Sequence, residues 1–152
     1  MSSDSTRFKK YEKYLYPKFL KVLNNLNLKK ESTLFITLIG NDKIKKLNNK
    51  YRGKNKVTNV LSFSFINNNE DFVQGALNNI LGEVYLAPDF IKKNEDILYL
   101  GIHGVLHLCG YDHELMSDFK IMDNFEKKLM RIANTTLLIL IFSELRVSFL
   151  YI

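Results

Sequence analysis

Residues 103–113 read His103-Gly-Val-Leu-His107-Leu-Cys-Gly110-Tyr-Asp-His113 and hold all three histidines of the chain. They close a strongly apolar stretch that predicts a buried helix ending at Gly110. His103 and His107 are four residues apart, so on a helix both rings lie on one face, about one turn apart. A left-handed turn at Gly110 can bring His113 back toward them. We therefore predict that the three imidazoles hold one metal ion.

The ligand set indicates which metal and which kind of site to expect. Three neutral imidazoles suit zinc, although nickel, copper and iron also accept them. Three protein ligands leave one position for water, which is typical of a catalytic site. The spacing matches the metzincin protease pattern H-E-x-x-H-x-x-G-x-x-H, except that Gly104 replaces the Glu that serves as general base. The sequence thus predicts a metal site without the base of peptide hydrolysis.

The rest of the chain alternates between helical and strand periodicity around this motif. Helices are expected over residues 8–28, 42–51, 96–109 and 116–132, with a further one opened by Pro88-Asp89. Strands are expected over residues 33–39, 60–65 and 81–86, and a turn or loop over 67–71. Pro17 should kink or split the first helix because proline lacks the amide hydrogen that a helix interior uses.

Length and composition favour a single domain over residues 1–152. A hydrophobic content of 46% excludes a disordered chain, and 152 residues suit one core. Cys109 is the sole cysteine, so no disulfide framework exists and a reducing, cytoplasmic location is expected. Its place in the buried helix predicts a buried, inert thiol. The polar N-terminus lacks the apolar region of a secretory signal.

The apolar tail, residues 135–152, is the unusual part of the sequence. Its longest charge-free run, Leu137 to Phe142, is far shorter than the roughly 20 residues of a membrane-spanning helix. We therefore expect no stable membrane insertion. An extra strand or helix packed on the domain is the favoured interpretation, and a membrane or partner contact is the alternative.

The chain carries 22 basic and 16 acidic residues, for a net charge of +6. Part of this excess reflects a composition rich in Lys, Asn and Ile, as an AT-rich coding bias would produce. The informative part is one loop, in which Lys50, Lys54 and Lys56 flank Arg52. The planar guanidinium of Arg52 can grip two phosphoryl oxygens, so these residues are candidates for RNA binding. Solvation alone is the alternative for the lysines.

Residues beside the histidines have two interpretations each. Asp112 could orient a ligand imidazole through its second nitrogen, as a second-shell residue does, or cap the turn after Gly110. Tyr111 could stack on a base or pack in the core. Glu114 could act as general base or simply lie on the surface. No residue clearly replaces the missing Glu of the protease pattern.

Three blocks of sequence together resemble the YbeY family of bacterial endoribonucleases. Residues 103–113 are similar to the family's H-G-x-x-H-L-x-G-Y-D-H signature. Residues 51–63 resemble its Y-R-x-x-D-K-x-T-D/N-V-L-S-F block, and residues 81–84 its L-G-D/E-I strand. The blocks occur in the family's order, and the resemblance covers about residues 8–132.

This resemblance implies an α/β (α+β) fold, a single small domain with a short mixed sheet of about four strands packed by about five helices. It implies one zinc ion held by His103, His107 and His113, and a functional role for Arg52, so these four are the expected catalytic residues. It also implies cleavage of single-stranded RNA in ribosomal RNA processing, namely late small-subunit rRNA maturation, and in ribosome quality control. The implied partners are ribosomal RNA, the small ribosomal subunit and its biogenesis factors.

The sequence departs from the family pattern at several points. The gap between Leu86 and His103 is short, which suggests a truncated helix before the metal site. Asn55 stands where the family has Asp, and Val57 where it commonly has Pro, which should loosen the basic loop. Two alternative functions remain at this stage, a zinc metallopeptidase-like hydrolase and a non-catalytic ribosome-biogenesis factor with structural zinc.

Overall fold

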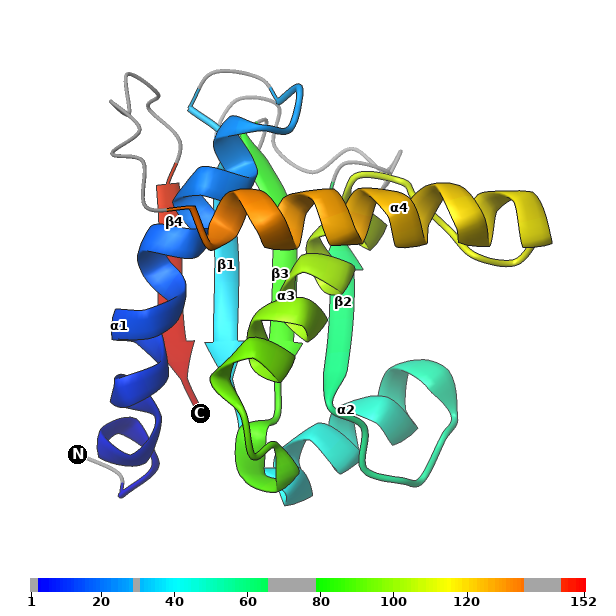
Figure 1. Ribbon diagram of the computed structural model, residues 1–152. Coiled ribbons are helices and arrows are strands. Elements are labelled where there is room, and N and C mark those ends of the chain that lie inside the picture. Colours follow the sequence, from blue (N-terminus) through cyan, green and yellow to red (C-terminus); the bar gives the residue numbers. More distant parts are fainter. Residues whose placement is uncertain (1–2, 29–30, 66–78, 136–145) are drawn as a thin grey trace.

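The computed structural model describes residues 3–28, 31–65, 79–135 and 146–152, and it places α1, α3 and α4 over one face of a four-stranded sheet (Figure 1). In chain order the elements are α1 (Ser3–Asn24), β1 (Thr33–Leu38), α2 (Asn41–Arg52), β2 (Val60–Ser64), β3 (Ile80–Leu86), the 3-10 turn η1 (Pro88–Phe90), α3 (Asn94–Leu108), α4 (Met116–Ala133) and β4 (Arg146–Tyr151). The predicted α/β fold with a short mixed sheet is confirmed.

The strands lie in the order β2-β3-β1-β4. β1 is parallel to both β3 and β4, whereas β2 is antiparallel to β3. The three strands predicted from alternation form within a residue of the expected bounds. The fourth comes from the apolar tail, as the favoured interpretation of that segment proposed. The last strand of the chain thus lies beside the first (Figure 1).

Alternation along β1 explains where the main core lies. Leu34, Ile36 and Leu38 are fully buried, and they pack in one cluster with the apolar stripe of α1 and the buried face of α3. A second, smaller cluster forms around Ile44 of α2 and Leu61 of β2. The main core fixes α3 against the sheet, and α3 carries two of the candidate ligands.

Two expectations based on proline need correction. Pro17 lies inside α1, which runs continuously from Ser3 to Asn24, so the predicted split does not occur and the predicted kink stays a prediction. Pro17 is on the exposed side, where water can satisfy the carbonyl of Lys13 that a proline leaves without its helical partner. Pro88 opens only the three-residue turn η1, and the next helix begins separately at Asn94. The described residues therefore form four α-helices and one 3-10 turn.

Two further expectations, the loop at 67–71 and the apolar run from Leu137 to Phe142, lie outside the described residues. Within the described part of the chain, no helix combines the length and apolar character needed to cross a membrane.

Candidate metal centre

The turn that ends α3 brings the third histidine back to the first two. Gly110 has a positive φ of 89°, as the left-handed turn required. Its amide donates to the carbonyl of His107 at 3.1 Å, and the amide of Tyr111 donates to that of Leu106 at 3.1 Å. These two bonds form a Schellman motif, in which the left-handed residue reverses the chain. His113 follows three residues later and reaches the same side of the helix.

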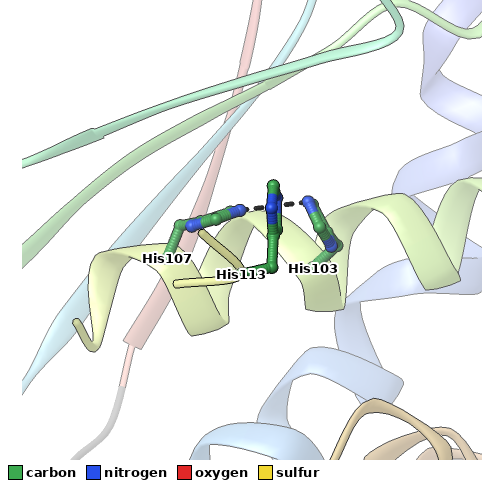
Figure 2. Close-up of side chains that lie close together, drawn as sticks. All are labelled: His103, His107 and His113. Atoms are coloured by element: carbon green, nitrogen blue, oxygen red, sulfur yellow. Dashed lines mark hydrogen bonds between the residues drawn. The ribbon is translucent and has the colours of Figure 1, made fainter. Parts of the chain in front are cut away.

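The three histidine rings face one another (Figure 2). Ligand nitrogens of His103, His107 and His113 all lie within 4.8 Å of each other. The Nε2 atoms of His103 and His107 are 3.1 Å apart, close to the roughly 3.4 Å that separates two nitrogens on a tetrahedral zinc ion. His103 and His107 are half-buried, and His113 is exposed. The donor set therefore fits a zinc-like ion that is open to solvent on one side.

A buried carboxylate holds the first histidine in place. Glu126 of α4 is only 3% exposed, and its Oε1 lies 2.6 Å from Nδ1 of His103. Because a carboxylate accepts hydrogen bonds, Nδ1 carries the hydrogen and donates it, which leaves the Nε2 lone pair free for a metal. Tyr99, one turn before His103 on α3, donates its hydroxyl to the other oxygen of Glu126 at 2.7 Å.

Electrostatics favour the protonation states that such a site needs. Burial lowers the pKa of His107, and the neighbouring His103 and His113 lower it further. The neutral imidazole, which is the form that binds metal, is therefore favoured at neutral pH. Burial and the hydrogen bond to Glu126 raise the pKa of Tyr99 to about 12, so its hydroxyl stays protonated and can donate.

Sequence reasoning did not identify Glu126 or Tyr99, although each carried a signal. Glu126 falls in the apolar stripe of α4, four residues after Met122 and three before Leu129, where a charged side chain is unusual. Tyr99 is four residues before His103, hence on the same face of α3. The two signals indicated partners for the histidine site, of which Glu126 is buried and Tyr99 is exposed.

Gly104 occupies the position of the missing protease base for a structural reason. A Cβ at this residue would lie 2.7 Å from Cγ1 of Val84 on β3 and 3.4 Å from Cγ2 of Val60 on β2. The helix backbone therefore packs directly on the sheet, and a side chain at position 104 would point into the core rather than toward the histidines. A glutamate base at this position does not fit the fold.

The other residues near the motif have contacts that favour one of their two interpretations. Oδ1 of Asp112 accepts a hydrogen bond from the backbone amide of His113 at 2.7 Å, which supports the turn-capping interpretation. Tyr111 packs on Phe125, with ring centroids 5.3 Å apart. Cys109 is half-buried rather than fully buried, and burial raises the pKa of its thiol, which agrees with an inert side chain. Glu114 is exposed.

Arg52 ends α2 and lines a surface cavity of about 420 Å³. Two of the three predicted lysines, Lys54 and Lys56, line it as well. Lys50 is not among the lining residues, and its Nζ lies 5.0 Å from the ring centroid of Tyr51. The cavity is defined by side chains other than the histidines, so the basic pocket and the metal centre are separate parts of the surface.

The basic loop is anchored despite its departures from the family pattern. Asn48 is 2% exposed, and its Nδ2 donates to the carbonyl of Lys56 at 2.9 Å. The amide of Lys54 donates to the carbonyl of Asn48 at 3.3 Å. These two hydrogen bonds with Asn48 of α2 hold the loop in place and so oppose the loosening expected at Val57. Residues 94–102 of α3 precede His103, and a truncation of this helix relative to the family stays a prediction.

Comparison with known proteins identifies the family. The profile of the endoribonuclease YbeY family matches residues 2–134. The chain belongs to the YbeY family. It is 34% identical over 137 residues to endoribonuclease YbeY of Thermodesulfovibrio yellowstonii, covering 82% of this chain and 83% of that protein. With the Buchnera aphidicola endoribonuclease YbeY it shares 37% identity over 137 residues, covering 81% and 80%.

A solved structure has a similar fold. The solution structure of TM1509 from Thermotoga maritima matches with a TM-score of 0.50 and 26% sequence identity, covering 88% of this chain and 85% of that one. The YbeY match at residues 2–134 contains the three histidines, Glu126 and Arg52, whereas β4 lies beyond it. The family resemblance inferred from the histidine motif is confirmed.

Proposed function

We propose that this YbeY family member is a zinc-dependent hydrolase that cleaves single-stranded RNA. The observation that carries the proposal is the convergence of three histidine nitrogens, one of them fixed by the buried Glu126, on one solvent-accessible point. This donor set suits zinc and leaves a coordination position for a reactant. The anchored cavity lined by Arg52, Lys54 and Lys56 supports a polyanionic substrate.

Some residues of the chain position the metal ligands, and others bind the negatively charged phosphates. Zinc, when bound, supplies Lewis-acid activation of water and of the phosphodiester. Glu126 keeps the Nδ1 hydrogen of His103 in place, so the ligand nitrogen stays directed at the metal site. The Arg52 guanidinium holds a phosphate and stabilises its developing charge, since its planar fork can bond two oxygens at once. Lys54 and Lys56 add attraction along the strand, and Lys50 flanks them.

The biological setting is part of the same proposal. We infer a cytoplasmic role in ribosomal RNA processing, with late small-subunit rRNA as the substrate, and in ribosome quality control. The partners would be the small ribosomal subunit and its biogenesis factors. The family membership and the basic pocket support this assignment.

The direct test is cleavage of a short fluorescent single-stranded RNA by the zinc-loaded protein, with and without a chelator. We expect cleavage that the chelator abolishes and zinc restores. His107→Ala should lose zinc and activity together, by atomic emission and gel assay. Arg52→Ala should keep its zinc and lose cleavage, and Arg52→Lys should recover only part of it because lysine lacks the planar fork. Equal zinc content in His107→Ala and the parent would contradict the metal assignment.

The same assay separates the two alternatives. A peptidase would cleave a casein or peptide substrate in a chelator-sensitive way, and the packing of Gly104 on Val84 argues against it. A non-catalytic zinc factor would bind the RNA without cutting it at any metal loading.

A further inference from the structure

A second hollow, of about 500 Å³, lies where the start of α3 meets the start of β2. Its wall includes two aromatic, two basic and two aliphatic side chains, and we call it the α3 groove. Its lining includes Asn59, Phe90, Lys92, Lys93, Asp96 and Tyr99. None of these residues is a metal ligand, and all but Asn59 lie outside the block of residues 51–63 that contains Arg52.

The α3 groove adjoins the Arg52 cavity. Asn59 lines the groove and also the cavity of Arg52, so the two hollows share a wall. The carbonyl of Asn59 accepts from the amide of Ala87 at 2.9 Å, which fixes this shared wall to the end of β3. Tyr99 also lines the groove, and its hydroxyl donates to the carboxylate that holds His103. The groove therefore adjoins the basic pocket and, through Tyr99, contacts the carboxylate that supports His103.

The chemistry of the groove is that of a surface for single strands. Phe90 is 74% exposed, and the turn that presents it is closed by the bond from the Ile91 amide to the Pro88 carbonyl at 3.0 Å. Lys92 and Lys93 follow directly and are both exposed. Proteins that bind single-stranded nucleic acid combine stacking aromatics with backbone-tracking cations in this way.

The charge of the groove favours a nucleic-acid strand over an apolar peptide as its ligand. Its two lysines outnumber its one acidic side chain, Asp96, and the neighbouring cavity adds Arg52, Lys54 and Lys56. Basic side chains in both hollows, together with an exposed ring, suit a polyanion that offers bases for stacking.

We propose that the α3 groove is a binding subsite for single-stranded RNA. The strand runs from the Arg52 cavity past Asn59 toward the metal centre. Lys92 and Lys93 bind its phosphates, and Phe90 stacks on one base. This inference rests on the proposed function and extends it to residues outside the motif blocks.

The test is binding of a fluorescent 2′-O-methyl oligouridine to the zinc-loaded protein, measured by anisotropy over a series of salt concentrations. For Lys92→Ala/Lys93→Ala we expect weaker binding and a slope of log affinity against log salt reduced by about 1.4, since each phosphate contact on a single strand contributes about 0.7. Phe90→Ala should weaken binding about fivefold or more, and Phe90→Tyr should bind like the parent because it keeps the stacking face.

The matched control is Lys9→Ala/Lys13→Ala, which removes the same charge from exposed positions on α1 that line a different hollow. It should leave the slope close to that of the parent. If the groove variants bind with parental affinity and slope while the parent still cleaves RNA, the groove inference is overturned and the proposed function stands. If the parent neither binds nor cleaves, the proposed function itself fails. Melting curves confirm that each variant is folded.

Discussion

Glu126 is the residue on which the geometry of the metal centre depends most. It is buried on α4, yet it bonds two groups of α3, the Nδ1 of His103 and the hydroxyl of Tyr99. A buried carboxylate that bonds two donors is stabilised by both, and it sets the tautomer of the ligand. The position of the metal-binding nitrogen is thus decided by a contact between two helices.

We predict that Glu126→Leu lowers zinc affinity about 10–100-fold, the usual cost of losing the partner of a ligand histidine. Glu126→Gln should lie between Leu and the parent, because its amide oxygen still accepts from Nδ1 but carries no charge. Competition with a chromophoric zinc chelator measures the affinities. The control is Asp123→Asn on the same helix, whose carboxylate pairs at 2.6 Å with Lys127 on the surface. Parental zinc affinity in Glu126→Leu would refute the assignment.

Gly104 makes the second residue-scale prediction. The Cβ of an alanine at position 104 would overlap Val84. Overpacking lowers the free energy of unfolding by about 1–3 kcal/mol. The better helix propensity of alanine offsets about 1 kcal/mol of this loss. Gly104→Ala should therefore lower the free energy of unfolding in the parent but not in a Val84→Ala background, where the space is open. Urea unfolding of all four proteins completes the double-mutant cycle. The same cost in both backgrounds would mean that the helix does not rest on Val84.

At the scale of the element, the tail strand β4 covers the edge of β1 and is the last strand on that side of the sheet. It pairs in parallel with β1 along its length, and Val147, opposite Leu34, is 8% exposed in the main core. The hydroxyl of Tyr151 donates to the carboxylate of Glu12 on α1. Although β4 lies beyond the family match, it is packed as an integral strand.

Val147→Ala should destabilise the protein by about 2 kcal/mol, because two buried methyl groups are lost and the site cannot fully collapse. Leu150→Ala on the same strand should change stability by less than about 0.5 kcal/mol, since Leu150 is 45% exposed. Chemical denaturation measures both. Equal effects of the two substitutions would show that β4 is not packed on the core in solution.

The elements also show how far the sequence can be read. Strands β1 to β3 and helices α2 to α4 were predictable because their signals, alternation and helical period, are local. The turn at Gly110 was predictable for the same reason. The bond from Glu126 to His103 and the pairing of β4 with β1 join segments that are 23 and more than 100 residues apart. Such contacts depend on how distant segments pack together. In a single sequence the sole trace of them is an unusual residue, such as a carboxylate in an apolar stripe.

At the scale of the whole molecule, the metal centre brings together side chains from two helices and the loop between them. His103 and His107 come from α3, His113 comes from the following loop, and Glu126 supports them from α4. His113 is exposed and lies in the loop between the two helices, so a bound ion would tie this loop to α3. Metal binding should therefore stabilise the fold as well as prepare it for chemistry, because the unfolded chain does not bring these nitrogens together.

We predict that zinc at about 100 times its dissociation constant adds about 2.7 kcal/mol of stability, which raises the melting temperature by roughly 5–10 °C for a domain of this size. His113→Ala should melt like the metal-free parent without zinc but show a much smaller zinc-induced shift, because one ligand is gone. Magnesium is the control, since it prefers oxygen ligands and should shift neither protein. Equal zinc shifts in parent and variant, measured by calorimetry, would show that His113 does not bind the ion and that the site holds its metal through α3 alone.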